Sequence, residues 1–393
     1  MVRQKWTQAW VCVFLFLSFS TAPVFAQTAL TNEGLVPQDA LNISADAAIL
    51  MDANTGHILY AKNAHKQRPP ASTTKILTAI LGLELGKPDE LVVVSEKAAA
   101  VGESTIHLDP GEKILLYELV TGAMVKSGND ACVAIAEQIA GTEEQFVRMM
   151  NQKAFLLGAL NTHFSNTNGL PHKEHLSTAY DLALMARYGM QIPAFSSITR
   201  LKETEIHFIQ PDFFMNLRNT NKLLWWYPGT DGFKTGWIGP ESGYCLASTV
   251  ERDGLRLIAV VLGAPQVRGN FKDSMTLYNY GFATYQFKEF LKKGQEVSKV
   301  KVGKGDRDYI TAITNERVGI MVPKGKGEGL STKIEVFPIV EAPVSQGQVV
   351  GKVTILKENE PIEEFELIAK ESVKKGSLWR EYKKLFSEII NFD

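Results

Sequence analysis

The stretch from Pro69 to Gly86 of this 393-residue chain reads PPASTTKILTAILGLELG. Its two prolines stop the preceding segment, and Gly86 ends the helix that the pattern predicts over Thr73 to Glu84. A helix that is apolar on nearly all of its faces belongs in the interior of a domain. We therefore expect a buried helix with few polar residues, namely Thr73, Thr74, Lys75, Thr78 and Glu84.

Ser72 and Lys75 are the chemically notable residues at the start of this helix. A helix N-terminus supplies free backbone N–H groups and a positive dipole end, which suits a site where an oxyanion forms. Lys75 follows one turn later on the same face, so its amine can reach the Ser72 hydroxyl. Burial eases loss of the lysine proton, and Lys75 could then be the base for a serine nucleophile. Ser72 alone could be an ordinary N-cap, but an unpaired lysine on so apolar a helix favours catalysis.

Strand patterns flank a helical middle. Helical patterns dominate from Leu115 to Met190, with Thr178 and Asp181 spaced like a capping box, and a last amphipathic helix is predicted over about Phe271 to Leu291. Predicted strands lie at both ends of this region, and predicted helices lie between them. This order predicts an α/β (α+β) domain, in which an antiparallel sheet is flanked by helices. The predicted strands are Ala47 to Asp52, His57 to Ala61, Ser242 to Val250 and Leu255 to Leu262.

The sequence changes character after Lys292-Lys293-Gly294. Short alternating runs, separated by Gly, Pro and Lys, predict a small C-terminal all-β domain ending near Lys370. The clearest of these runs are Val297 to Val302, Ile334 to Phe337 and Val349 to Ile355.

The first 26 residues are typical of an export signal. Arg3 and Lys5 precede a charge-free apolar run, and Val24-Phe25-Ala26 is a small-x-small cleavage site. A retained anchor is the alternative, although the run is shorter than the roughly 20 apolar residues that a span needs. We expect a signal peptide at 1–26, a catalytic domain at 27–293, a β domain at 294–370 and a C-terminal helix at 371–393.

The composition is that of an ordinary globular protein, with 45% hydrophobic and 22% charged residues. The 42 basic and 43 acidic residues nearly balance, which does not favour a nucleic-acid partner. Beyond the leader, Cys132 and Cys245 could form at most one disulfide, and we expect small buried thiols instead.

Three short motifs carry the chemistry: Ser72-Thr73-Thr74-Lys75, Ser127-Gly128-Asn129 and Lys234-Thr235-Gly236. Singly they are weak signals, because helix caps and turns contain the same residues. In this order they match the signature of penicillin-binding proteins and class A β-lactamases.

The second and third motifs supply groups that such chemistry needs. Ser127 offers a hydroxyl that can relay a proton, and Asn129 offers an amide that can hold a substrate peptide group. Lys234 brings a second cation and Thr235 a hydroxyl for an anionic substrate end. Gly236 leaves room for close backbone approach, and an edge strand there could bind an extended peptide.

The longer stretches around these motifs resemble the D-alanyl-D-alanine carboxypeptidases among the low-molecular-mass penicillin-binding proteins. The resemblance rests on Ala47 to Ala79, Ser127 to Cys132 and Asp231 to Gly236, and the family's usual layout of leader, transpeptidase-like domain, β domain and anchor covers the whole chain. It implies a serine peptidase that removes the terminal D-alanine from peptidoglycan stem pentapeptides, is acylated by β-lactams such as penicillin, and uses no metal or cofactor.

The resemblance also implies a role for each matching residue. Ser72 would be the acylated nucleophile and Lys75 the general base, while Ser127 and Lys234 would carry a proton to the leaving amine. Asn129, Thr235 and Gly236 would bind substrate, and the backbone N–H groups of Ser72 and Trp237 would form the oxyanion hole. Residues 237–240, Trp-Ile-Gly-Pro, depart from the family's usual run, which puts substrate contacts there in doubt.

Other interpretations of the sequence are weaker. His172 and His175 are spaced like a metal pair but lie in a proline-containing loop without a third ligand. The absence of GxSxG around Ser72 argues against an α/β-hydrolase. Trp225 and Trp226 could line a substrate groove or fill the core.

Two other functions remain as alternatives. A class A β-lactamase deacylates with a Glu before KTG, and no E-x-x-L-N pattern occurs between Asn129 and Lys234. A non-catalytic penicillin sensor would need a transmembrane signalling segment, which the sequence after the leader lacks.

The segment Ser377 to Asp393 repeats apolar residues at helical spacing and is basic at its near end. This pattern predicts an amphipathic helix lying in an anionic membrane interface. Docking on the β domain or on another subunit is the alternative. With the export signal, the prediction is a secreted protein anchored peripherally to the outer face of the cytoplasmic membrane.

Overall fold

The computed structural model describes residues 40–377 together with Trp379, Arg380 and Tyr382. The predicted signal peptide and nearly all of the predicted C-terminal helix lie outside these residues. None of the described helices combines the length and the apolar character of a membrane-spanning segment.

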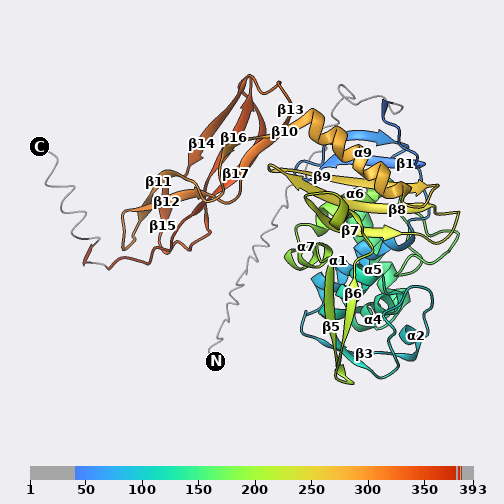
Figure 1. The fold of residues 1–393 in the computed structure, drawn as a ribbon. Helices are drawn as coiled ribbons and strands as arrows, with labels where there is room; N and C mark the ends of the chain where they lie inside the picture. Colours follow the sequence, from blue (N-terminus) through green and yellow to red (C-terminus); the bar gives the residue numbers. More distant parts are fainter. Residues whose placement is uncertain (1–39, 378, 381, 383–393) are drawn as a thin grey trace, which may run out of the picture. The chain divides into compact units, whose positions relative to one another are not determined.

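A five-stranded antiparallel sheet forms the centre of the catalytic domain (Figure 1). Its strands, in spatial order, are β2 (Ile58–Lys62), β1 (Ala47–Asp52), β9 (Leu255–Ala264), β8 (Tyr244–Arg252) and β7 (Thr230–Gly236). The predicted strands and the antiparallel arrangement are therefore confirmed. The strand that carries Lys234-Thr235-Gly236 is an edge strand, as peptide binding by strand addition requires.

Both faces of this sheet are buried, which explains why β1 is apolar from Ala47 to Met51 rather than alternating. Ile49 and Met51 of β1 face one core, which includes Ile76 and Ile80 of the buried helix. Leu50 faces a second core with Leu277 and Tyr278. Helices cover each face of the sheet. The first face is covered by α6 (Ala179–Gly189) and α1 (Lys75–Leu85), and the second by α9 (Gly269–Thr284).

The helical middle of the chain packs around α1, whose residues from Lys75 to Gly82 are all buried. The expected N-cap of α6 is confirmed, because Thr178 Oγ1 accepts a hydrogen bond from Asp181 N at 3.0 Å. The remaining helices are α2 (Glu96–Ala99), α3 (Leu116–Thr121), α4 (Asn129–Ala140), α5 (Glu143–Leu156), α7 (Pro193–Thr199) and α8 (Leu223–Trp226), with a 3-10 turn η2 (Ala71–Thr74) and a π-helical turn η3 (Gly122–Lys126).

A second, four-stranded sheet was not predicted. Its order is β3 (Leu91–Val93), β4 (Lys113–Leu115), β5 (Glu203–Gln210) and β6 (Phe213–Arg218). Its first two strands are three residues long and only their middle residues, Val92 and Ile114, are buried, so they carry too little alternation to signal a strand.

The prediction of one helix from Phe271 to Leu291 is wrong. Helix α9 ends at Thr284, and Tyr285 to Leu291 form β10, which pairs with β13 (Val318–Pro323). Tyr285 and Phe287 alternate with polar residues, and pairing with β13 selects the strand over a longer helix.

The C-terminal part is all β, as predicted. A six-stranded sheet has the order β14 (Leu330–Val336), β16 (Val349–Lys357), β17 (Glu360–Ala369), β12 (Tyr309–Thr314), β11 (Glu296–Gly303) and β15 (Ile339–Glu341). It encloses a core of its own that includes Val302, Val353 and Leu367.

Candidate active site

Ser72 lies in the 3-10 turn η2, immediately before α1 begins at Lys75. The regular helix thus begins two residues later than predicted, after a tighter turn. Ser72 is half-buried, whereas Lys75 is fully buried. The Lys75 ammonium nitrogen lies 2.8 Å from Ser72 Oγ, so the predicted contact between nucleophile and base is present in the fold.

Lys75 Nζ has two further partners, both carbonyl oxygens. Asn129 Oδ1 and the backbone oxygen of Asn168 each accept a hydrogen bond from it at 2.7 Å. A neutral amine has two N–H groups and one lone pair. When the two carbonyls take both N–H groups, the lone pair faces the hydroxyl of Ser72, as a general base requires.

Burial lowers the pKa of Lys75 from 10.5 to about 8, and the charge on Asp130 opposes the shift. Near pH 7.5 a lysine with that pKa is neutral about a quarter of the time, compared with roughly one part in a thousand for an ordinary lysine. The site therefore supplies neutral amine at physiological pH.

The second motif lies where η3 passes into α4. Ser127 adopts a left-handed conformation with φ 75° between the two elements, and Asn129 is the first residue of α4. Asn129 Nδ2 donates to Gly102 O at 2.9 Å, which fixes its side-chain oxygen toward Lys75. Within residues 40–377, Ser127 Oγ makes no direct hydrogen bond with Lys75 or Lys234.

The third motif ends the edge strand β7. Lys234 is buried, and its Nζ donates to Thr235 O at 3.0 Å. Burial, and then the nearby charge of Lys75, lower the pKa of Lys234 well below its usual value. The two buried lysines therefore act on one another electrostatically.

Thr235 and Gly236 complete this edge. The Thr235 hydroxyl donates to Thr220 Oγ1 at 2.7 Å, so a second hydroxyl stands beside the one that the sequence predicted. A Cβ atom at Gly236 would lie 3.0 Å from Ser72 N, so a side chain here would press on the turn that holds Ser72.

Trp237 follows the end of β7, so the strand does not continue into the unusual run 237–240. Its ring is 54% exposed and stacks on Tyr244 with ring centroids 6.0 Å apart. An exposed, stacked aromatic ring next to the third motif forms a surface against which a substrate can pack.

Sequence reasoning missed the loop between α5 and α6. Its Asn168 acts through a backbone carbonyl, for which the side-chain pattern holds no signal. Gly169 has φ 91°, and a Cβ there would lie 2.0 Å from Ala71 O, so this loop lies directly against the nucleophile turn.

His175, considered above as a metal ligand, holds the same loop in place. Its Nδ1 accepts from Ser165 N at 3.0 Å, and its Nε2 lies 2.7 Å from the Thr74 hydroxyl. Burial lowers the pKa of His175 to about 3, so the ring is neutral. These contacts give His175 a structural role in the loop. His172 is engaged separately, because its Nδ1 accepts a hydrogen bond from Glu174 N.

Both cysteines are buried free thiols, as expected. Cys132 Sγ lies 3.2 Å from Gly128 O, and burial raises the pKa of its thiol to about 12. Trp226 is 45% exposed and packs edge-on against Phe271.

Ser72 and Lys75 are thus in hydrogen-bond contact at the start of a buried helix, beside the edge strand of an antiparallel sheet, an arrangement that a serine hydrolase can use. The D-alanyl-D-alanine carboxypeptidase family profile, peptidase S11, matches residues 34–266. A second profile, the C-terminal domain of penicillin-binding protein 5, matches residues 285–375. The chain belongs to this family of serine D-Ala-D-Ala carboxypeptidases.

Particular relatives match over most of their length. The D-alanyl-D-alanine carboxypeptidase DacF of Bacillus subtilis is 36% identical over 94% of this chain and 96% of its own. The crystal structure of penicillin binding protein 5 from Haemophilus influenzae has a TM-score of 0.62 at 31% identity, over 85% of this chain and 98% of that one. The structure of DacD from Francisella tularensis has a TM-score of 0.62 at 30% identity, over 87% of this chain and 96% of that one.

Proposed function

We propose that Ser72 is the nucleophile of a carboxypeptidase that removes the terminal D-alanine from peptidoglycan stem pentapeptides through an acyl-enzyme. The observation that carries this proposal is the hydrogen bond of 2.8 Å between Lys75 Nζ and Ser72 Oγ, made at a buried lysine with a lowered pKa. Lys75 takes the hydroxyl proton while Ser72 Oγ attacks the carbonyl carbon of the penultimate residue.

The oxyanion that forms is held by the backbone N–H groups of Ser72 and Trp237. The close approach of Gly236 to Ser72 N supports this assignment, because it brings the end of β7 to the nucleophile turn. Such donors act best when they are fixed before the reaction begins. Ser72 lies in the turn η2, and Trp237 directly follows the last residue of β7.

The substrate carboxylate settles the proton distribution between the two lysines. Two buried ammonium groups repel one another, so removing the proton from one favours the charged form of the other. A carboxylate bound by Lys234 and Thr235 stabilises the ammonium of Lys234. Binding therefore leaves Lys75 as the neutral partner, ready to accept the proton of Ser72.

Collapse of the tetrahedral intermediate releases D-alanine. Ser127 passes a proton to its amine with the help of Lys234, and an amide N–H of Asn129 holds the acyl part of the peptide. Because Asn129 Oδ1 is engaged with Lys75, only its Nδ2 group is oriented to donate to substrate. Water activated by Lys75 then hydrolyses the ester.

One assay tests the activity: release of D-alanine from a stem pentapeptide, with and without penicillin. Wild-type protein should release D-alanine and lose this activity after penicillin treatment, whereas Ser72→Ala should release none. Failure of the wild type to release D-alanine would contradict the proposed function.

A β-lactam should acylate Ser72 and remain bound much longer than a peptide acyl group. Its leaving amine stays tethered and obstructs the incoming water. Intact mass spectrometry should show one added penicillin on the wild type and none on Ser72→Ala. Rapid turnover to penicilloate would favour the β-lactamase alternative instead.

We also propose export and peripheral anchoring on the outer face of the cytoplasmic membrane. The leader pattern of residues 1–26 and the basic amphipathic pattern of Ser377 to Asp393 support this. Protein lacking Ser377 to Asp393 should stay active but no longer float with anionic vesicles. Equal flotation of both forms would dismiss the anchor.

A further inference from the structure

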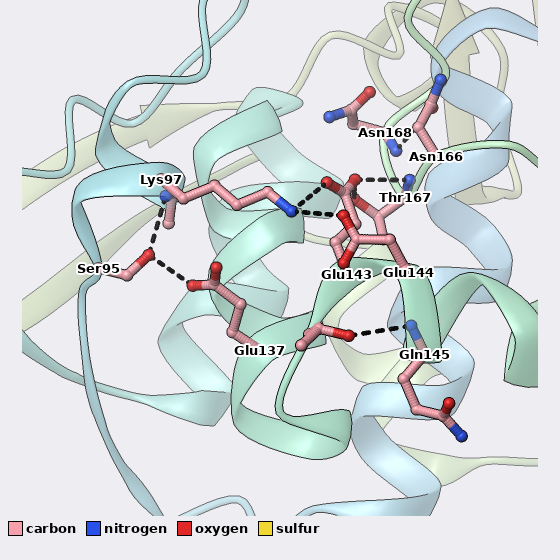
Figure 2. A network of polar contacts seen from close by, with 11 residues as sticks. Ser95, Lys97, Glu137, Glu143, Glu144, Gln145, Asn166, Thr167 and Asn168 are labelled. Atoms are coloured by element: carbon pink, nitrogen blue, oxygen red, sulfur yellow. Dashed lines mark hydrogen bonds and ion pairs between the residues drawn. The ribbon is translucent and has the colours of Figure 1, made fainter.

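Glu143 connects the surface of the catalytic domain to the loop that contacts Lys75 (Figure 2). It is the first residue of α5, and its Oε1 accepts two hydrogen bonds from Thr167, from the hydroxyl at 2.9 Å and from the backbone N–H at 3.2 Å. Two bonds to one residue fix both the side chain and the peptide plane of Thr167.

Thr167 is fully buried and is held from the opposite side by the helix of the active site. The Thr78 hydroxyl of α1 donates to Thr167 O at 2.6 Å. The next residue along the chain, Asn168, provides the carbonyl oxygen that accepts from Lys75 Nζ. Glu143 and Thr78 thus hold Thr167, the residue immediately before the Asn168 carbonyl, at its N–H and at its carbonyl oxygen respectively.

The carboxylate of Glu143 is itself restrained on its outer side. Lys97 of α2 lies 3.5 Å from Glu143 Oε2 and 3.0 Å from Glu144 Oε1 (Figure 2). The side chain of Glu143 is 17% exposed, whereas that of Glu144 is 68% exposed. The adjacent glutamates therefore share one cation, but the hydrogen bonds to the active-site loop come from Glu143.

We propose that Glu143 is a positioning residue for Lys75: it fixes the Asn168 carbonyl, which takes one N–H of Lys75 and leaves the lone pair facing Ser72. The inference deepens the proposed acylation step and rests on it. Asn166 Oδ1 also restrains the peptide between Asn168 and Gly169, since it accepts from Gly169 N at 2.7 Å. Without Glu143, however, the loop can shift and carry the Asn168 carbonyl away from Lys75. Lys75 then loses an acceptor that both orients its neutral form and stabilises its charged form.

Other charged or titratable groups also face Lys75. They are Asp130 and Cys132 from α4, Lys234 from β7 and His175 from the loop after α5. A substitution at position 143 removes none of these groups, although the charge of Glu143 also acts on the Cys132 thiol. A change in the pH profile therefore reports either the Asn168 contact or the charge of Glu143. A glutamine at position 143 separates these two, because it keeps an oxygen for Thr167 and loses the charge.

The experiment compares Glu143→Ala with Glu144→Ala, in full-length protein, by the second-order rate of acylation with a fluorescent penicillin across pH. Glu143→Ala should slow acylation at least about tenfold, since small displacements of catalytic groups are costly, and should move the acidic limb to lower pH. Glu144→Ala should match the wild type, although it also loses a partner of Lys97. Glu143→Gln should recover most of the rate.

Each other outcome is decisive. Equal rates and profiles for Glu143→Ala and Glu144→Ala, with an active wild type, would overturn the positioning role alone. A lower melting temperature with an unchanged rate per folded molecule would also overturn it, because it shows a purely structural role. A wild type that penicillin does not acylate would refute the proposed function instead.

Discussion

A Cβ atom placed on Gly236 would lie 3.0 Å from the backbone nitrogen of Ser72. The edge strand therefore packs closely against the turn that holds Ser72, with the Ala71 Cβ also 3.0 Å from that position. The Cβ placed on Gly236 would likewise lie 3.0 Å from Pro70 O, so the contact involves the whole turn. This packing sets the position of Ser72 N relative to the end of β7.

Gly236→Ala should slow acylation about tenfold without unfolding the protein, because the turn must shift by a few tenths of an ångström away from the strand. Stopped-flow acylation with penicillin measures the rate, and circular dichroism on heating measures the fold. An acylation rate equal to that of the wild type would show that the position of Ser72 N is not critical.

The acylation rate should rise with pH through about 8, the lowered pKa of Lys75. The sign follows from the role of base: the ammonium form below this pKa cannot accept the Ser72 proton, and the neutral amine above it can. Second-order rates measured from about pH 6 to about pH 10 test this expectation. A rate that falls across this interval would require Lys75 to act in its charged form.

Lys234→Ala should lower D-alanine release about a hundredfold or more, because a positioned electrostatic and proton-transfer group is lost. Lys222→Ala is the control: Lys222 lies over the ring of Trp225, 5.1 Å from its centroid, and belongs to none of the three motifs. Steady-state kinetics of both variants decide the matter. Similar rates for the two would remove Lys234 from the site.

Gly169→Ala should destabilise the protein by about 2 to 5 kcal/mol, combining left-handed backbone strain with a clash. The clash is with Ala71 O, 2.0 Å from the added Cβ. Gly141→Ala isolates the strain, since Gly141 has φ 77° and nothing within 4 Å of its Cβ position. Gly141→Ala should lower the free energy of unfolding, measured in urea, by only about 1 to 2 kcal/mol. If both variants lost the same free energy of unfolding, the loop at position 169 would have moved to remove the clash.

The sequence alone determined the elements whose signals are local. The apolar run after Lys75 marks a buried helix because few polar side chains interrupt it, and the residues from Ala47 to Asp52 mark a strand. Spacing within one helical turn placed Lys75 beside Ser72, and the structure confirms that contact.

Only the tertiary structure decided which distant groups complete the site. The carbonyl of Asn168 and the hydroxyl of Thr220 contact motif residues that lie 93 and 15 positions away in the sequence. Backbone carbonyls carry no side-chain signal, and long-range contacts depend on how the layers pack. The short strands β3 and β4, and the change from helix to strand at Tyr285, likewise depend on partner strands supplied by the fold.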